Sequence, residues 1–200
     1  MDIYKSIGIV QVYENNGVGW NQIGSNISGK AWTADVMQTS INAKIGFYPN
    51  SIDINGNGNF IVVASSNSSD KSEMYVEVYK LNNNNWSKHG QTIEAGFGSR
   101  TNVSINDVGD RISIGDPDNK RVFVYKYNLG VWEIMGAPII SFDETFGFSA
   151  KLSDSGFGIV IGAPKKDYKG RVDNGGVYVY QWDLVEWKQI GSFVEPQNID

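Results

Sequence analysis

The sequence predicts an all-β protein, a β-propeller assembled from a repeated unit. In each copy of the unit a Val-Tyr pair is followed by Trp seven residues after the Tyr and by Gly four residues after the Trp. The copies are Val12-Tyr13-Trp20-Gly24, Val78-Tyr79-Trp86-Gly90, Val124-Tyr125-Trp132-Gly136 and Val179-Tyr180-Trp187-Gly191. The steps from Tyr to Tyr are 66, 46 and 55 residues. A constant core with connections of variable length is typical of stacked β-repeats.

Two further strand-like runs precede each of the last three Val-Tyr pairs. The two runs of each pair are separated by a short segment rich in Asn, Asp and Gly, which is the usual signal of a β-hairpin. The pairs are Phe47–Ile54 with Asn59–Ser66, Thr101–Asn106 with Asp110–Pro117, and Phe146–Ser153 with Phe157–Pro164. These runs predict the first two strands of each unit.

The Val-Tyr run itself predicts the third strand, and the fourth begins at the Trp. In the last copy Val177 and Val179 point to one face of the strand, and Tyr178 and Tyr180 point to the other, because side chains alternate along a strand. Both faces are apolar, so both should be covered by neighbouring sheets. Four-stranded antiparallel sheets that repeat in this way predict the blades of a propeller.

The predicted blades form a single β-propeller-like domain over residues 1–200: a half blade at 7–24 and full blades at about 45–93, 97–140 and 146–193. The half blade lacks its first two strands, and Phe193-Val194-Glu195 could supply one strand. Because exposed sheet edges are liabilities, something should cover them. The two ends could jointly close a four-bladed ring, copies of the chain could assemble, or the chain could be part of a longer polypeptide. We therefore expect a protein partner, or further copies of the chain itself, at the open blade edges.

Composition excludes several classes of partner. The chain has 40% hydrophobic and 20% charged residues, no cysteine, and a formal net charge of -5. An acidic chain is poorly suited to nucleic acid or to an anionic membrane surface, since both require basic patches. No apolar run approaches the length of a transmembrane helix, so we expect no membrane insertion. We see no signal peptide at the N-terminus, which leaves an intracellular protein, a virion-associated protein or a chain whose leader was removed.

The repeats resemble the FG-GAP family, the repeat of the integrin α-chain propeller and of many bacterial and viral surface proteins. Phe146-Gly147 and Gly162-Ala163-Pro164 carry both motifs of that family, and Phe97-Gly98 with Gly115-Asp116-Pro117 carry them with one change. The first full unit is degenerate at both motifs. The resemblance covers roughly residues 7–193 and is closest to uncharacterised repeats of bacteria and large DNA viruses. It implies a propeller, and it does not imply one activity.

The resemblance also points to a candidate calcium site in the loop that joins the first two strands of a blade. Asp53, Asn55 and Asn57 place oxygen side chains at alternate positions beside tight Gly turns, and such a set can wrap a hard cation. The later acidic ligand of the family falls at Ile61, which cannot coordinate a metal. The alternative is a plain Asn-Gly hairpin loop. No other cofactor is expected.

The aromatic residues have two interpretations. The four Trp residues of the repeat could be platforms for sugar stacking, but a residue that recurs once per blade is expected to pack one blade against the next. Trp182 extends an apolar face and is expected in the core. Trp32, in the irregular segment 29–42, is a candidate for an exposed contact surface. His89 stands where other copies carry Ile or Met, so a packing role is expected for it.

We expect a non-catalytic β-propeller that serves as a structural or protein–protein interaction module, in a virion or at a microbial surface rather than in the cytoplasm. No triad or repeated polar constellation is visible, and carboxylate pairs such as Asp116/Asp118 and Asp143/Glu144 fall in predicted loops. No catalytic residue is therefore assigned. The alternative is a ligand-binding propeller, either a lectin or a calcium-dependent adhesin.

Overall fold

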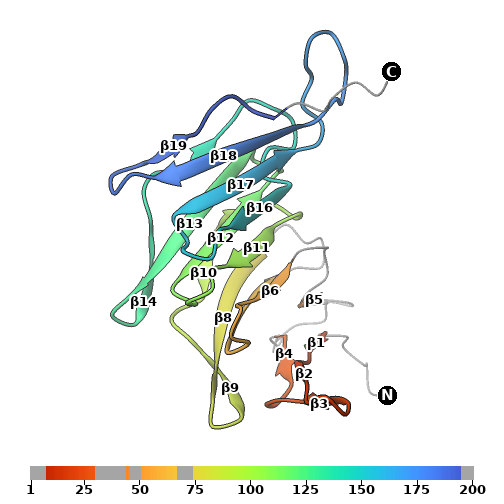
Figure 1. Cartoon of the computed structure of the whole chain (residues 1–200), viewed down its shortest axis with the longest axis vertical. Coiled ribbons are helices and arrows are strands. Elements are labelled where there is room, and N and C mark those ends of the chain that lie inside the picture. Colours follow the sequence, from red (N-terminus) through yellow and green to blue (C-terminus); the bar gives the residue numbers. More distant parts are fainter. Residues whose placement is uncertain (1–7, 30–43, 46–50, 67–73, 195–200) are drawn as a thin grey trace, which may run out of the picture.

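The computed structural model describes residues 8–29, 44–45, 51–66 and 74–194 of the chain, and the fold is given for these residues. They contain strands, turns and bends and no helix. The strands form antiparallel sheets that follow one another along the chain. Figure 1 shows β1–β4 at one end of the molecule and β16–β19 at the other. The all-β class and the antiparallel sheets predicted from the sequence are confirmed.

The N-terminal half sheet consists of two short ribbons. β1 pairs with β4 and β2 pairs with β3, both antiparallel. The strands are β1 (Ile9–Val10), β2 (Tyr13–Asn15), β3 (Trp20–Gln22) and β4 (Ile27–Ser28). Together they correspond to the third and fourth strands of a full unit, and they continue slightly beyond the segment 7–24 predicted from the sequence.

The first sheet corresponds to the second predicted segment, 45–93; it begins one residue before that segment and ends a few residues after it. From one edge to the other, the sheet has four positions: β5 with β6, then β7, then β8, then β9 with β10. Each of the two outermost positions is divided into two short strands. The strands are β5 (Lys44–Ile45), β6 (Ile52–Ile54), β7 (Phe60–Ser66), β8 (Met74–Asn82), β9 (Asn85–Lys88) and β10 (Ile93–Phe97).

The second and third sheets repeat this order, and they fall within the segments predicted at 97–140 and 146–193. The second contains β11 (Asn102–Ile105), β12 (Arg111–Asp116), β13 (Arg121–Asn128), β14 (Val131–Ile134) and β15 (Ile139–Ile140). The third contains β16 (Ser149–Leu152), β17 (Gly158–Ala163), β18 (Gly176–Trp182) and β19 (Trp187–Gln189). Val194 bridges to Val177, so the tail pairs with its own sheet, in the position that β10 and β15 hold in the others.

Hairpins between the first two strands of each sheet are closed by a polar side chain. Asn55 Oδ1 accepts hydrogen bonds from the backbone N–H of Asn59 and Phe60, at 3.0 and 2.8 Å. Asn106 Oδ1 accepts the corresponding pair from Asp110 and Arg111. Asn favours such turns because its short side chain reaches the backbone of the following residues. The predicted hairpin loops are therefore present; Asn stabilises the first two, and in the third sheet Ser153 Oγ accepts a hydrogen bond from the backbone N–H of Gly158.

Three apolar cores lie between successive sheets. One joins the half sheet to the first sheet, one joins the first to the second, and one joins the second to the third. In each junction the Val pair of one unit faces the aromatic residues of the next unit. Val122 and Val124 of the second sheet, for example, pack with Tyr178, Tyr180 and Trp187 of the third. Both faces of the internal sheets are therefore covered, as their sequence predicted.

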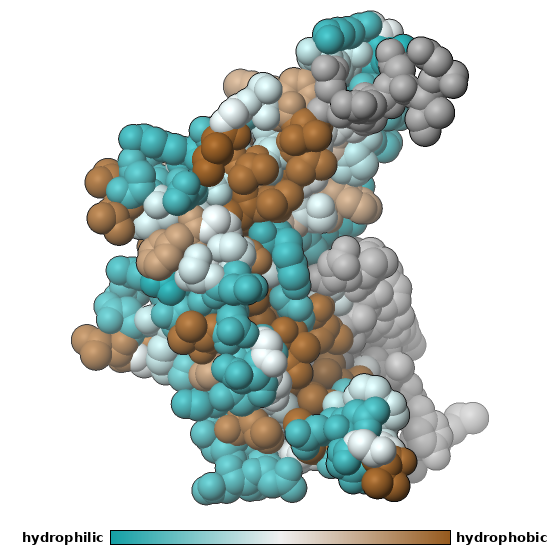
Figure 2. Space-filling view, viewed as in Figure 1, coloured by the Kyte–Doolittle hydropathy of each residue, from teal (hydrophilic) through white to brown (hydrophobic). Residues whose placement is uncertain are grey.

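The end faces of the stack differ from the internal ones. The side chain of Val122 is fully buried, whereas its counterpart Val177 in the third sheet is 39% exposed. Val160 and Ile190 of the same sheet are also exposed. Figure 2 shows apolar side chains gathered over the region of β17 and β18. No closed ring of sheets is present among the described residues, so the propeller remains a proposal.

Candidate functional site: the inner-strand pocket

The first strands of the three sheets lie side by side and enclose a small pocket. β11 contacts both β6 and β16, and the three strands adjoin one another in Figure 1. The pocket has a volume of about 200 Å³, and we call it the inner-strand pocket. It is lined by Ile52, Asp53, Asn102, Val103, Ser149, Ala150 and Lys151. All three sheets contribute to it, and no single repeat could form it alone.

An ion pair between the first and third sheets lies in the lining of the pocket. Lys151 Nζ is 2.6 Å from Asp53 Oδ2, although the two residues are far apart in the sequence. The same oxygen accepts a hydrogen bond from the backbone N–H of Ile105 in the second sheet, at 3.0 Å. Asp53 is largely buried, whereas the Lys151 side chain is 65% exposed. The Asp53 carboxylate therefore joins all three sheets at this point.

Asn102 holds the other side of the pocket by hydrogen bonds to the third sheet. Its Nδ2 donates to the carbonyl oxygen of Gly147 at 2.7 Å, and its Oδ1 accepts from the backbone N–H of Ala150 at 3.1 Å. Ser104 Oγ accepts from the N–H of Leu152 in the same way. Because a buried amide is costly unless its donor and acceptor are both satisfied, these contacts fix the spacing of β11 and β16.

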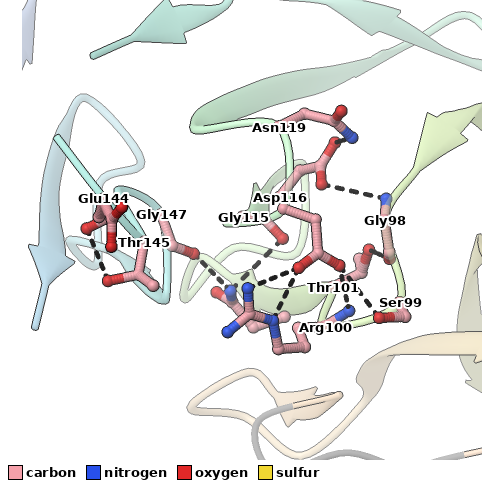
Figure 3. Close-up of polar contacts among 12 residues, drawn as sticks. Gly98, Ser99, Arg100, Thr101, Gly115, Asp116, Asn119, Glu144, Thr145 and Gly147 are labelled. Carbon is pink, nitrogen blue, oxygen red and sulfur yellow. Dashed lines mark hydrogen bonds and ion pairs between the residues drawn. The ribbon is translucent and has the colours of Figure 1, made fainter. Parts of the chain in front are cut away.

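Asp116 is the centre of a polar network beside the pocket (Figure 3). Its side chain is fully buried. Oδ1 accepts from the backbone N–H of Gly98 at 3.0 Å. Oδ2 accepts from Asn119 Nδ2 at 2.9 Å and from Arg121 Nε at 2.8 Å. Arg121 also donates to the carbonyl oxygen of Gly96. A buried carboxylate is tolerated when it is paired and fully hydrogen-bonded, and Asp116 meets that condition.

Asp118, two residues further along, forms a second and more open pair. It accepts hydrogen bonds from Ser99 Oγ and from the Nε of Arg100, the latter at 2.7 Å. Burial alone would raise the pKa of the Asp118 carboxyl, but the hydrogen bonds and positive charge of Arg100 outweigh burial and lower it. The carboxylates of Asp116 and Asp118 thus hold the loop 98–101 in place, and their Arg partners rule out a free acid/base pair.

A third polar cluster lies in the third sheet. Asp143 accepts hydrogen bonds from Lys166 Nζ, at 2.7 Å, from Ser141 Oγ and from the phenol of Tyr178. Burial would raise the pKa of Asp143, but the bonds from Lys166 and Tyr178 lower it overall. Burial would lower the pKa of Lys166, and the bonds to Asp143 and Tyr178 raise it instead. Asp143 is therefore ionised and Lys166 is protonated at neutral pH, which suits a structural pair better than a general base.

The side chains predicted to bind calcium do not converge on one point. Asp53 is bonded to Lys151 and to the backbone of Ile105, and Asn55 is bonded to its own hairpin and to the carbonyl oxygen of Asp107. Asn57 is exposed. Among the described residues no group of three or more His, Cys, Asp or Glu side chains could hold a metal ion. In this structure the side-chain oxygens of Asp53 and Asn55 accept hydrogen bonds from backbone N–H groups and an ammonium, and the calcium site stays a prediction.

Three of the four repeat Trp residues occupy the sheet junctions. The indole Nε1 of Trp86, Trp132 and Trp187 donates to the carbonyl oxygen of Ile23, His89 and Met135 in the preceding unit, at 3.0, 2.8 and 2.9 Å. The predicted packing role is confirmed for these three. It is wrong for Trp20, which is 69% exposed, because no described sheet precedes the half sheet. Trp182 packs with Trp187, as expected.

Two further residues singled out from the sequence have different outcomes. The ring of His89 stacks on Tyr127 with a centroid separation of 3.8 Å and meets Phe60 edge-on, so it does take a packing position. Burial lowers the pKa of His89, and the nearby Lys80 adds to this effect. Trp32 lies outside the described residues.

Sequence reasoning missed Asn102, Lys151 and Arg121. Asn102 and Lys151 occur inside strand-like runs, and Arg121 is the first residue of β13. Polar residues at such positions are usually expected to face solvent. One signal could have drawn attention to Asp116: it replaces the Ala of a Gly-Ala-Pro motif, so a carboxylate stands where the last unit has a methyl group. Its partner Arg121 could not be identified without the turn that connects β12 and β13.

Comparison with known proteins gives the fold and nothing more. The sequence matches no protein-family model and no curated protein sequence. The structure resembles a "putative 6-phosphogluconolactonase" from Bacteroides uniformis, with a TM-score of 0.53 and 13% identity, over 96% of this chain and 52% of that one. A second protein so described, from Bacteroides fragilis, has a TM-score of 0.56 and 13% identity, over 93% and 51%.

A hypothetical selenium-binding protein from Sulfolobus tokodaii is also similar, with a TM-score of 0.50 and 10% identity, over 88% of this chain and 47% of that one. This chain therefore spans about half the length of the three structures. Sequence identities this low do not indicate that this chain shares the chemistry of those proteins, since one fold hosts many functions.

In the described part of the chain, no helix is long and apolar enough to cross a membrane.

Proposed function

We propose that this chain forms an arc of a β-propeller and serves as a non-catalytic structural or protein–protein interaction module. The three sheets and the half sheet would be blades, with β6, β11 and β16 nearest the axis. Propellers generally contain four to eight blades, so a further set of strands would be needed to complete the ring. The solved structures that this chain resembles are about twice as long as the matched segment, which supports an arc.

The observation that carries the proposal is the use made of the polar side chains near the axis. The carboxylate of Asp53, the amide of Asn102 and the hydroxyl of Ser104 each bond a different sheet from their own. Catalytic groups need a free lone pair or proton directed at substrate. Here the lone pairs and protons of these groups are used in hydrogen bonds between blades, so their role is to hold the arc rigid. A virion or microbial surface is the setting that the resemblance to FG-GAP repeats favours.

The competing function is a lactonase, because two similar solved structures are described as 6-phosphogluconolactonases. Binding of a phosphorylated lactone would need a positively charged group to pair with its phosphate, and Lys151 is the cationic side chain in the pocket lining. A lactonase assay on the purified chain separates the two functions. We expect no turnover above the uncatalysed rate. Hydrolysis that is lost in Lys151→Met and retained in the exposed control Lys126→Met would overturn the proposal.

The ligand-binding alternative, a lectin, is tested independently on a glycan array. The exposed Trp20 and the inner-strand pocket are the places where a sugar could stack or enter. We expect no saturable binding. A glycan that binds the wild-type chain and Asn102→Ala differently would favour the lectin over the interaction module.

A further inference from the structure

Each internal junction of the stack uses the same contact between successive units. The carbonyl oxygen of the residue before the repeat Gly accepts the indole N–H of the next unit. A Trp ring of the next unit also covers the Gly: the donating Trp itself at the first two junctions, and chiefly Trp182 at Gly136. A Cβ on Gly90 would lie 2.7 Å from Trp132 Cδ1, and a Cβ on Gly24 would lie 2.5 Å from Trp86 Cδ1. The Gly at each junction has a positive φ, and a Trp ring of the next unit lies against it.

The two ends of the chain carry the two unmatched halves of this contact. At the N-terminal end Trp20 and Tyr13 are 69% and 47% exposed, whereas their counterparts Trp132 and Tyr125 in the second sheet are 3% and 9% exposed. At the C-terminal end Gly191 keeps the positive φ of the repeat, +68°, yet nothing among the described residues lies within 4 Å of the position its Cβ would take.

The apolar surfaces beside these residues are also complementary. In the internal junctions the paired Val residues of one unit face the Tyr and Trp of the next. Val177 and Ile190 at the C-terminal end are exposed and have no aromatic residue of a following unit over them in the described structure. Strand β3, which begins at Trp20, and strand β19, which ends two residues before Gly191, lie at opposite ends of the stack in Figure 1, so one chain in this conformation cannot join the two ends.

We propose that a second copy of this chain docks head to tail, with Trp20 of one copy on the Ile190 carbonyl and Gly191 of the other. The new junction would reproduce the three internal ones, with Tyr13 over Val177 of the partner copy. Such a contact joins two different surfaces, so it can close a ring or continue as a chain of copies. The half sheet supplies only outer strands, so the contact is smaller than an internal junction and a weak, concentration-dependent association is expected.

The inference rests on the proposed interaction role, and its test is independent of turnover. Sedimentation velocity of the wild-type chain over a concentration series should show reversible self-association. Trp20→Ala and Val177→Lys should each weaken it by about tenfold or more, since truncating a central aromatic residue or burying a lysine removes a main contributor to binding. Val18→Ala, at the tip of the same hairpin as Trp20, and Val172→Lys, in an exposed loop, are the matched controls and should leave association unchanged.

Mixing the two disabled variants gives the decisive measurement. Trp20→Ala retains the Gly191 end, and Val177→Lys retains the Trp20 end, so the mixture should form a one-to-one complex and nothing larger. A wild-type chain that stays monomeric at every concentration would overturn the inference and leave the non-catalytic role standing. A Val177→Lys variant that self-associates as well as the wild type would also overturn it, because it would indicate pairing of two like ends.

Discussion

The indole Nε1 of Trp132 donates a hydrogen bond of 2.8 Å to the backbone carbonyl of His89, across the junction between the first and second sheets. The ring of the same Trp lies against Gly90, which has a φ of +84°. One residue therefore satisfies a backbone acceptor, fills the space over a glycine and buries an aromatic surface. Trp86 makes the same contact with Ile23 and Gly24, so an internal unit carries both a Trp that packs on the preceding unit and a Gly that receives a Trp of the next.

Gly90→Ala should test this contact directly. A Cβ at this position requires a left-handed backbone conformation, which costs about 1–2 kcal/mol, and forces Trp132 to move, which costs about 1–3 kcal/mol more. We expect urea unfolding to show a loss of roughly 2–5 kcal/mol. Gly17→Ala is the control, because Gly17 has a φ of +86° and nothing within 4 Å. Equal losses in the two variants would show that the Trp contact contributes nothing.

Asp116 and Asp118 give a matched pair of carboxylates, one buried and one partly open. Asp116→Ala leaves Arg121 and the Gly98 N–H without their acceptor, and breaking a buried pair of this kind costs about 3 kcal/mol. Asp118→Ala should cost no more than about 1 kcal/mol, because a solvent-screened ion pair contributes little. Denaturant unfolding of both variants checks the difference. Similar losses in the free energy of unfolding would mean that the burial of Asp116 does not account for the stability that the network contributes.

His89 should make stability depend on pH near neutrality. Burial against Phe60 and Tyr127 lowers its folded-state pKa below the ordinary value of 6.5. As the pH falls, the unfolded chain therefore binds a proton at a higher pH than the folded chain does. The stability that is present above pH 6.5 is lost as the pH falls toward the folded-state pKa. Thermal melts should show a modest decline through this window.

The control for this effect is His89→Met, which places the residue of the third copy at this position. It should remove the decline, since no other histidine occurs in the chain. An NMR titration of His89 gives the folded-state pKa directly. A value above 6.5 would reverse the predicted sign and contradict the packing explanation.

The Asp53–Lys151 pair should respond as an exposed ion pair and not as a calcium site. A double-mutant cycle with Asp53→Asn and Lys151→Met should give a coupling of less than about 1 kcal/mol, since the Lys151 side chain is mostly exposed. Addition of calcium should leave the melting temperature unchanged, because the Asp53 carboxylate already serves Ile105 and Lys151. A rise in melting temperature that Asp53→Asn abolishes would contradict this expectation and support the calcium site.

Much of the fold could be predicted from residue patterns. The alternation in 157–164 and 176–182 is local, because the two faces of a strand are set by the chain itself, and it identified β17 and β18. The Asn-Gly hairpins were predicted on the same basis. The role of the repeat Trp followed from its regular recurrence. The error at Trp20 has a physical reason: a packing residue is buried only if a preceding sheet is present to cover it.

The candidate site could not be predicted in this way, because its bonds join residues from different sheets. The sequence determined the strands, their turns and the alternation of their faces, since these depend on neighbours along the chain. Only the tertiary structure decided that Asp53 meets Lys151, that Asn102 reaches Gly147 and that Asp116 is buried with Arg121. It also decided which copies of the Trp and Gly are matched and which are left open at the two ends. Asp116 and Arg121 are partners within the second sheet, but the other contacts depend on how the sheets stack. A spacing that is constant within a unit does not determine how one unit packs on the next.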